Sequence, residues 1–430
     1  MERLLLLALS LVVVLCHEQF QVIFEWKSID FQWPSEEVRK VAVSRGDYIA
    51  SNNFITTVKF WKDKMYLTLP RWENGVPVTL GVTSAKPVDG DTAPLLNPFP
   101  NWDMQKLGDC SAFQLVHSME IDPKGRMWVL DTGRSTALRT ENKGNCPARL
   151  VILDLEDNGK VIHTYEFPDH VARRGVTYLN DIVLDHENGG MAFITDNGGD
   201  DPGIIVYSVK NNTSWKIRHD SMKAKEEAVK FMVSKTRVIR PVHVEGIALS
   251  PASKDDRQIY YSPLSSFHLY SIPVSAARDN TTNIDQYVNE IGRKLSQTDG
   301  MAMSATGVLY FGLLADDAIA MWDTKNTSSF TTGQRIISRD HLLTQWPDSF
   351  TFDEDGNFWC VSNMLQNFLN HRVNINVPNY RLIRTHVGVK NYQYYENGTA
   401  PEWPDFTAGA ESVKFALATL LVVILVFVAK

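Results

Sequence analysis

Three carboxylic acids, an amide and an imidazole recur at one equivalent position of a repeated sequence pattern. Each lies five residues before a turn, and together they are His117, Asn180, Glu245, Asp299 and Asp348. Carboxylates held close together repel one another unless protonation, a cation or a cationic ligand compensates their charge. If the fold gathers these side chains, the sequence predicts a site for a small cationic molecule or for a metal ion.

The repeated pattern is a pair of short β-prone segments joined by a turn that often contains glycine. Its clearest copy runs through Val116–Asp122, a Pro-Lys-Gly turn and Met127–Asp131. Such pairs predict antiparallel strands. Six copies follow one another at intervals of roughly 50 to 65 residues, which suits a propeller blade of four strands. Their turns are marked by Lys62, Asp122, Asp185, Ser250, Ser304 and Asp353.

This repetition predicts an all-β fold, a six-bladed β-propeller that occupies residues 18–400. A closed ring explains why no linker rich in Pro, Gly or Ser interrupts the repeats. The first strand of each propeller blade lines the central channel. The five residues named first, called here the five channel positions, should therefore face a shared space. Asn379–Arg384 is expected to pair with a segment from the N-terminal end and to remove the last open sheet edge.

Three interpretations of the five channel positions remain open. A cationic amine could offset the carboxylates, or calcium could be bound by Asn180, Glu245 and Asp299, which carry the hard oxygen ligands this ion takes. A bound metal could polarise a carbonyl group and permit hydrolysis. In a purely structural alternative, the polar side chains only hydrogen-bond neighbouring blades, as Asp131, Asp196 and Ser362 could also do.

The two ends of the chain carry apolar segments. Residues 1–17 combine a charged start with thirteen apolar residues and are expected to be a cleaved secretory signal. Residues 415–430 form an apolar tail behind a small and polar spacer, 401–414, and this order favours a lipid-anchor signal over a membrane anchor. We therefore expect a secreted protein that is tethered to the outer cell surface.

Composition and cysteine usage agree with an extracellular protein. The formal net charge is −7 and no block of Lys or Arg stands out, so a nucleic-acid partner is not expected. Cys110 and Cys146 flank strands of the second blade and are expected to form a disulfide, whereas Cys360 is expected to be a buried, inert thiol. Glycosylation sequons lie in polar connections, at Asn211, Asn212, Asn280, Asn326 and Asn397.

Several ordered motifs together resemble the yellow / major royal jelly protein family of insects. They include Gly108-Asp-Cys, Met127-Trp-Val-Leu-Asp-Thr-Gly-Arg, Cys146-Pro-Ala-Arg-Leu, Tyr178-Leu-Asn-Asp and Asn379-Tyr-Arg. The resemblance covers roughly residues 26–384 and implies a secreted six-bladed propeller. It also implies roles that range from pigmentation and cuticle to dopachrome conversion, the binding of biogenic amines, and the eggshell.

The resemblance carries over to individual residues only in part. Asn363 matches an asparagine of the amine-binding members, while Asp348 stands in place of their threonine and Leu365 in place of their phenylalanine. Aspartate suits a cationic amine, but loss of the aromatic ring weakens stacking. Met321 replaces a frequent cysteine, and the apolar tail is not general in the family.

The sequence therefore predicts a surface-tethered or secreted protein that binds a small catechol- or indole-type ligand in its channel, at Asn180, Glu245, Asp299, Asp348 and Asn363. One alternative is a dopachrome-converting isomerase, with His117 as the base that removes a carbon-bound proton. Others are a structural cuticle or eggshell protein without a ligand and a calcium-dependent, lactonase-like hydrolase. Motifs of several common enzyme classes, such as Gly-x-Ser-x-Gly and His-Glu-x-x-His, are absent from the sequence.

Overall fold

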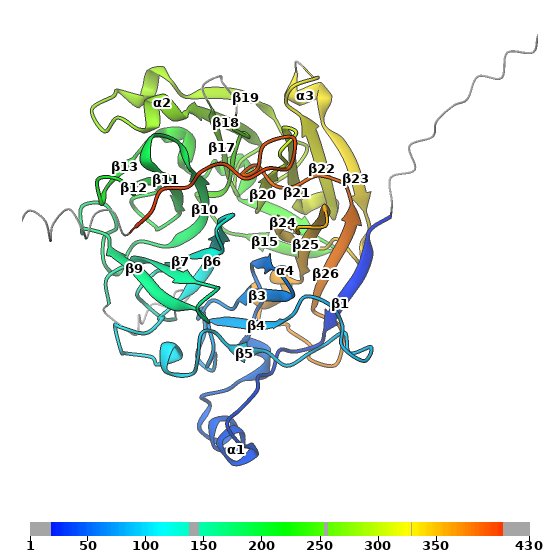
Figure 1. Ribbon diagram of the computed structural model, residues 1–430. Helices are drawn as coiled ribbons and strands as arrows, with labels where there is room; N and C mark the ends of the chain where they lie inside the picture. Colours follow the sequence, from blue (N-terminus) through cyan, green and yellow to red (C-terminus); the bar gives the residue numbers. More distant parts are fainter. Residues whose placement is uncertain (1–18, 137–145, 253–256, 328, 407–430) are drawn as a thin grey trace, which may run out of the picture.

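Six four-stranded antiparallel sheets form a ring in the computed structural model, which describes residues 19–136, 146–252, 257–327 and 329–406 (Figure 1). The sheets follow one another in chain order, so each is one blade of a six-bladed β-propeller, as the repeats predict. The expected signal, residues 1–17, and the apolar tail, residues 415–430, lie outside the described residues.

Each blade is built from its innermost to its outermost strand. Blades 1 and 2 contain β2 (Val58–Trp61), β3 (Lys64–Thr68), β4 (Leu80–Ser84) and β5 (Asn97–Pro98), then β6 (Val116–Ile121), β7 (Arg126–Asp131), β8 (Arg149–Asp154) and β9 (Lys160–Glu166). Blades 3 and 4 contain β10 (Leu179–Asp185), β11 (Met191–Asp196), β12 (Gly203–Ser208) and β13 (Thr213–Ile217), then β16 (Val244–Leu249), β17 (Gln258–Pro263), β18 (His268–Pro273) and β19 (Asn289–Arg293). Blades 5 and 6 contain β20 (Met301–Met303), β21 (Val308–Leu313), β22 (Ala318–Asp323) and β23 (Arg335–Arg339), then β24 (Pro347–Phe352), β25 (Asn357–Asn363), β26 (Tyr380–His386) and β1 (Gln21–Trp26).

The turn between the first two strands of a blade is held by its leading aspartate. Asp122 accepts hydrogen bonds from the backbone N–H groups two and four residues later, and Asp353 repeats both contacts. The glycine that follows, Gly125 in the first case, has a positive φ of 76° that other residues rarely adopt. The indole N–H of Trp128 or Trp359 donates to the other carboxylate oxygen of the same aspartate. The motif Asp-x-x-Gly thus closes the hairpin and fixes a core tryptophan.

The ring is closed by its two ends. Strand β1 pairs antiparallel with β26, so a segment from the N-terminal end completes the blade formed by the last three propeller strands. Figure 1 shows β1 in blue beside β26 in orange. Phe24 and Trp26 of β1 are almost fully buried in this seam. The predicted closing role of Asn379–Arg384 is confirmed.

The C-terminal segment, residues 387–406, crosses one face of the ring (red in Figure 1). The hydroxyl of Tyr392 accepts a hydrogen bond of 2.8 Å from the backbone of Leu184 in β10, and Gln393 donates one of 2.9 Å to the backbone of Ile121 in β6. Trp403 is buried and the ring of Phe406 lies over Arg126. The described part of the expected spacer, residues 401–406, therefore packs on the propeller.

Smaller elements decorate the blades. The helices are α1 (Glu36–Arg45), which projects from the body in Figure 1, and the short α2 (Val274–Ala277), α3 (Phe330–Gly333) and α4 (Leu365–Leu369). Within the described part of the chain, no helix combines the length and apolar character needed to cross a membrane. Residues 219–229 contain two 3₁₀ turns and lead into a hairpin of β14 (Lys230–Val233) and β15 (Thr236–Ile239).

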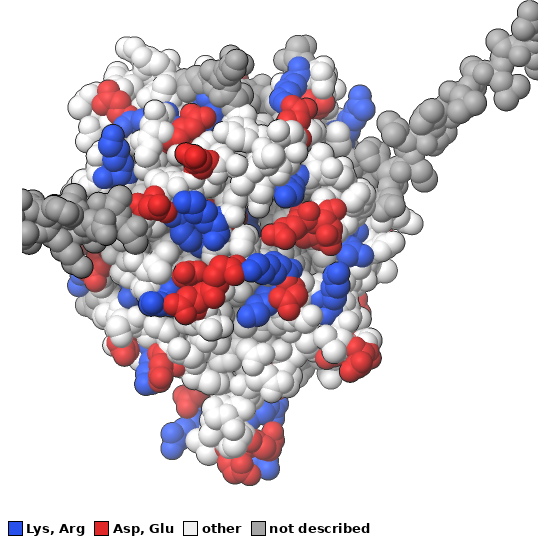
Figure 2. Space-filling model, viewed as in Figure 1, with Lys and Arg blue, Asp and Glu red and all other residues white. Residues whose placement is uncertain are grey.

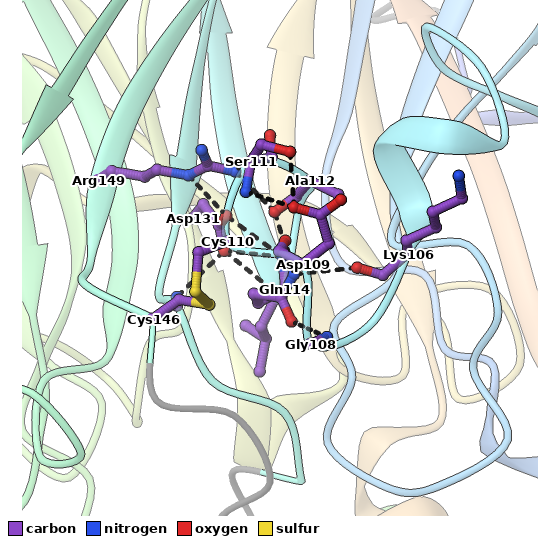
Figure 3. Close-up of a disulfide and its surroundings, with 12 residues drawn as sticks. Lys106, Gly108, Asp109, Cys110, Ser111, Ala112, Gln114, Asp131, Cys146 and Arg149 are labelled. Carbon is purple, nitrogen blue, oxygen red and sulfur yellow. Dashed lines mark hydrogen bonds and ion pairs between the residues drawn. A yellow bond between two sulfur atoms is a disulfide. The ribbon is translucent and has the colours of Figure 1, made fainter.

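The cysteines follow the sequence-based expectations, and the charged residues on the surface are of mixed sign. Figure 2 shows acidic and basic side chains interspersed over the face that carries the C-terminal segment. Cys110 and Cys146 form a disulfide with Cα atoms 5.3 Å apart, as predicted (Figure 3). Cys360 is a buried free thiol, also as predicted. The five sequon asparagines are exposed, and their glycosylation stays a prediction.

Candidate ligand-binding site

A cavity of about 230 Å³ opens at one end of the central channel. It is larger than the roughly 150 Å³ cavity that accepts a benzene ring in another protein. Its walls combine aromatic and aliphatic side chains with a few charged ones. Those that matter for the argument are Trp72, His117, Arg134, Tyr178, Arg240, Glu245 and Trp346.

Local irregularities in the first strands present the channel positions to this space. The pairing of β6 with β7, β10 with β11, β16 with β17, and β24 with β25 shifts register next to His117, Asn180, Glu245 and Asp348, respectively. Bulges of this kind leave a residue unpaired and redirect its side chain. The aligned repeat position therefore corresponds to a repeated distortion of the innermost strand.

Two glycines allow the first strands of blades 4, 5 and 6 to approach closely. A Cβ atom on Gly246 would lie 2.3 Å from the carbonyl oxygen of Asp299, and one on Gly300 would lie 2.2 Å from that of Asp348. No side chain fits there without displacing the backbone. The absence of side chains at these two positions is what brings the three channel carboxyls into one neighbourhood.

An aromatic group forms one wall of the cavity. The indole of Trp72 donates a hydrogen bond to the hydroxyl of Tyr178, which lies 2.8 Å from Nδ1 of His117. Burial lowers the pKa of His117 to about 3, so its imidazole is neutral near pH 7. Threonines from blade 1 hydrogen-bond the backbone carbonyl of His117, which fixes its position. This wall offers ring faces and one neutral hydrogen-bonding pair.

Glu245 is the acidic group of the cavity lining. Asn180 donates a hydrogen bond of 2.7 Å to its Oε1, and Asn197 donates a longer one of 3.3 Å to the same atom. Its Oε2 is buried and has no hydrogen-bond partner among the described residues. Burial, together with the charges of Asp299 and Asp348, raises the pKa of Glu245 well above its usual value. One face of this carboxyl is therefore held by amides and the other is unsatisfied.

The two remaining carboxyls lie behind the cavity wall and have partners. Asp299 accepts a hydrogen bond of 2.6 Å from the indole of Trp346, and burial raises its pKa to about 7. Asp348 accepts one of 2.7 Å from Asn363, while burial and the charge of Asp299 raise its pKa well above the usual value. Neither lines the cavity directly. The three carboxyls therefore hold protons at pH values where exposed ones are ionised.

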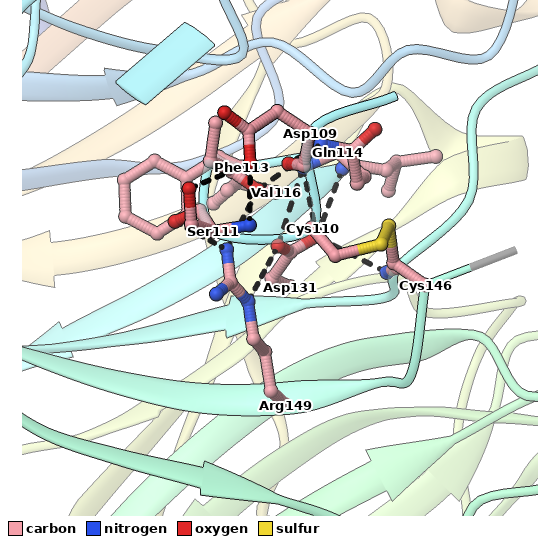
Figure 4. A network of polar contacts seen from close by, with 12 residues as sticks. Asp109, Cys110, Ser111, Phe113, Gln114, Val116, Asp131, Cys146 and Arg149 are labelled. Atoms are coloured by element: carbon pink, nitrogen blue, oxygen red, sulfur yellow. Dashed lines mark hydrogen bonds and ion pairs between the residues drawn. A yellow bond between two sulfur atoms is a disulfide. The ribbon is translucent and has the colours of Figure 1, made fainter. Parts of the chain in front are cut away.

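A buried polar network holds the loop that leads into β6 and His117 (Figure 4). Asp131 accepts hydrogen bonds from the backbone N–H groups of Gln114 and Leu115 and pairs with Arg149 at 3.1 Å. In the next blade Asp196 accepts from the backbone of Tyr178 and pairs with Lys216 at 2.8 Å. Both aspartates thus bond within their own blade, and each positions an aromatic or imidazole group of the cavity.

The structure gathers the predicted site residues around one end of the channel, but in two layers. His117 and Glu245 line the cavity, whereas Asn180, Asp299, Asp348 and Asn363 lie behind them as hydrogen-bonded partners. The aligned channel positions do not include the aromatic residues of the cavity, although Tyr178 and Trp346 stand two residues before Asn180 and Asp348. Arg134 and Arg240 were likewise not predicted as site residues.

The predicted calcium ligands are only partly arranged as a metal site. Asn180 donates its amide N–H to Glu245, so the two groups face each other as donor and acceptor. Among the described residues there is no group of three or more His, Cys, Asp or Glu side chains that could hold a metal ion. The predicted set contains only two such side chains and an amide, so calcium binding stays a prediction.

The first strands lead from the cavity to a second, much smaller space of about 30 Å³. Its lining includes Glu120, three residues beyond His117, and Lys59 of β2, which form an ion pair of 2.9 Å. Ser118 donates a hydrogen bond of 2.9 Å to Asp181, and Tyr392 of the C-terminal segment covers the space. This end of the channel is filled and internally paired.

The sequence of this chain is similar to those of several known proteins over most of its length. The family model described as Major royal jelly protein matches residues 114–391. Major royal jelly protein 3 of Apis mellifera is 30% identical over 389 residues, which cover 85% of this chain and 69% of that protein. Protein yellow of Drosophila guanche is 28% identical over 399 residues, covering 87% and 68%. Dopaminechrome tautomerase of Drosophila melanogaster is 26% identical over 384 residues, covering 86% and 82%.

Proposed function

Because the chain belongs to the major royal jelly protein family, we propose that its channel cavity binds a small catechol- or indole-type molecule. The observation that carries the proposal is the unsatisfied Oε2 of Glu245 beside an aromatic wall. A buried polar atom without a partner costs free energy, which a ligand donor would recover.

The cavity offers complementary contacts to each part of such a molecule. The faces of Trp72, Tyr178 and Trp346 can stack on or edge against an aromatic ring. An ammonium group placed at Oε2 of Glu245 would donate a hydrogen bond to that atom. Its positive charge would also offset the negative charge of the neighbouring carboxyls Glu245, Asp299 and Asp348. Aromatic and acidic contacts together select a cationic aromatic compound.

Calorimetric titration of the protein with dopamine and with tryptamine tests this proposal. Glu245→Gln keeps the shape of the side chain but removes its ability to ionise, and we expect it to weaken binding by about tenfold or more. Glu156→Gln changes an exposed glutamate paired with Lys62 and serves as the matched control. Absence of binding by both compounds, or equal affinity of Glu245→Gln and the unmodified protein, would contradict the proposal.

A second candidate function is tautomerisation of an aminochrome, which the name of one relative, dopaminechrome tautomerase, favours. In such a step a C–H bond of the saturated part of the ring system breaks, its proton moves to a base, and the electron pair moves into the conjugated system as a quinone oxygen gains a proton. A base works best when its pKa lies near the operating pH. Burial makes the ionised form of Glu245 a stronger base than an ordinary carboxylate and makes the imidazole of His117 a weaker base.

Turnover of dopaminechrome separates these two bases. If Glu245 accepts the proton, Glu245→Gln loses about 100-fold or more in kcat, while His117→Gln keeps most of it. A loss of kcat confined to His117→Gln would instead support the imidazole of His117 as the base. Binding of dopaminechrome without turnover in the unmodified protein would support ligand binding as the function and contradict tautomerisation.

The site of action is proposed to be outside the cell, in pigmentation, cuticle or eggshell. The disulfide between Cys110 and Cys146 supports an oxidising compartment, and the five sequon asparagines are accessible. Expression of the full chain in insect cells tests secretion and tethering together. Release from the cell surface by a phospholipase that cleaves glycolipid anchors would support the lipid anchor, and retention after that treatment would contradict it.

A further inference from the structure

The mouth of the cavity carries a cation that the channel carboxyls do not neutralise. Arg240 follows strand β15 and lines the cavity, yet its guanidinium forms no hydrogen bond or ion pair with any described residue. A guanidinium carries five N–H donors in a planar fork that matches a carboxylate. A side chain of this kind beside a concave, partly apolar space is equipped to bind an anion.

A second arginine enters the same cavity from another blade. Arg134 follows β7, and its Nε and Nη2 donate hydrogen bonds of 3.2 Å to the backbone carbonyls of Thr177 and Val176. These contacts hold its guanidinium against the rim near Tyr178. The described lining therefore contains two arginines and one glutamate, Glu245.

The charges are separated along the depth of the cavity. Glu245 belongs to the innermost strand β16 and lies beside Asn180, whereas Arg240 lies on the connection from the hairpin β14–β15 to that strand. Burial raises the pKa of Glu245, so its carboxyl compensates the guanidinium of Arg240 less than an exposed, ionised carboxylate would. A molecule that carries both an ammonium group and a carboxylate offers a partner to each of these two groups.

We propose that Arg240, assisted by Arg134, binds the carboxylate of the ligand, so that the cavity selects aromatic amino acids and their carboxylated derivatives over the corresponding decarboxylated amines. The inference rests on the proposed ligand site and adds the chemical class of its ligand. Arg240 acts as a specificity-determining residue because a decarboxylated amine leaves its guanidinium without a partner. A bidentate pair with a carboxylate is stronger than a neutral hydrogen bond and depends on the planar fork.

Two matched ligand pairs, each differing by one carboxylate, test the proposal by calorimetry: L-DOPA against dopamine, and L-tryptophan against tryptamine. We expect the carboxylated member of each pair to bind about tenfold or more tightly at low salt. Arg240→Gln should remove this preference while the affinity for the amines changes by less than about twofold. Arg240→Lys, which keeps the charge and loses the fork, should retain part of the preference.

Arg237→Gln provides the matched control, because Arg237 lies on β15 just before Arg240, is exposed and does not line the cavity. Thermal unfolding of each variant confirms that it is folded. Equal or tighter binding of the amines by the unmodified protein, or an equal loss for both members of a pair in Arg240→Gln, overturns this inference but leaves the ligand site intact. Absence of binding by all four compounds overturns the ligand site and the inference together.

Discussion

The two ends of the central channel differ in how their buried carboxyl groups are compensated. At the end covered by the C-terminal segment, Lys59 pairs with Glu120 and opposes the rise that burial causes in the pKa of Asp181, which reaches about 6. At the cavity end no lysine or arginine of the described residues pairs with Glu245, and burial with neighbouring acidic groups raises its pKa well above the usual value. The first end is complete within the protein, and the second requires protons or a ligand.

This difference indicates which carboxyls serve folding and which serve binding. A buried charge that is paired contributes to one well-defined structure, although the pair itself need not stabilise it. A buried carboxyl without a cation is costly and tends to persist where function requires it. The unsatisfied oxygen of Glu245 therefore carries more information about function than the ion pair of Lys59 with Glu120.

The largest predicted effect comes from removing the ion pair between Lys59 and Glu120. Lys59→Met leaves Glu120 buried without its cation, and we expect the free energy of unfolding to fall by about 3–5 kcal/mol. Denaturant unfolding measures this change. The double variant Lys59→Met with Glu120→Leu should recover most of the loss. An isolated loss below about 1 kcal/mol would show that the two ends do not differ as described.

A second prediction concerns the pH dependence created by the cavity end. The pKa of Asp299 is about 7 in the folded protein, above its ordinary value of 3.8, so the folded state binds this proton more tightly than the unfolded state. The free energy of unfolding should therefore fall as pH rises from about 4 to about 7, by at most about 1.4 kcal/mol per pH unit for this group.

Asp299→Asn should flatten that decline, because the amide can still accept the hydrogen bond from Trp346 and does not ionise. It should also lower the pKa of Glu245 by removing a neighbouring charge. Denaturant unfolding at several pH values compares the two proteins. An unchanged slope between pH 4 and pH 7 would contradict the raised pKa of Asp299.

The smallest predicted effect concerns Tyr392 of the C-terminal segment, which covers the channel end that contains Lys59 and Glu120. Tyr392→Phe removes the hydroxyl that accepts the backbone N–H of Leu184 and leaves that group buried without a partner. We expect a loss of about 1–2 kcal/mol in the free energy of unfolding. Ligand affinity at the cavity end should not change. A change in affinity comparable to that of Glu245→Gln would show that the two ends are coupled.

The architecture was predictable because each blade repeats its own local chemistry. Asp122 and Asp353 hold the same turn, so aligned turns reveal aligned first strands, and the six-bladed ring with its closure by β1 and β26 follows. The same alignment located the channel carboxyls. Carried two residues further toward the N-terminus, it would have reached the aromatic residues Tyr178 and Trp346 as well.

The rest of the site could not be obtained from the repeats. Arg240 follows the hairpin β14–β15, an insertion that has no counterpart in the repeat, and Trp72 lies in the connection between β3 and β4. Alignment also could not reveal that Asn363 and Trp346 occupy the hydrogen-bonding positions of two carboxyls. Tertiary contacts decide which aligned residues face the cavity, and these depend on side chains outside the repeated pattern.

Burial without a cationic partner raises the pKa of the Glu245 carboxyl, so a bound ammonium group should favour its ionised form and displace its proton. Calorimetric titration with dopamine near pH 7, repeated in buffers that differ in their enthalpy of ionisation, counts the protons released on binding. We predict that the binding of dopamine releases protons, and that the number released per dopamine is smaller in Glu245→Gln. Binding without proton release, or with equal release in both proteins, would contradict the account.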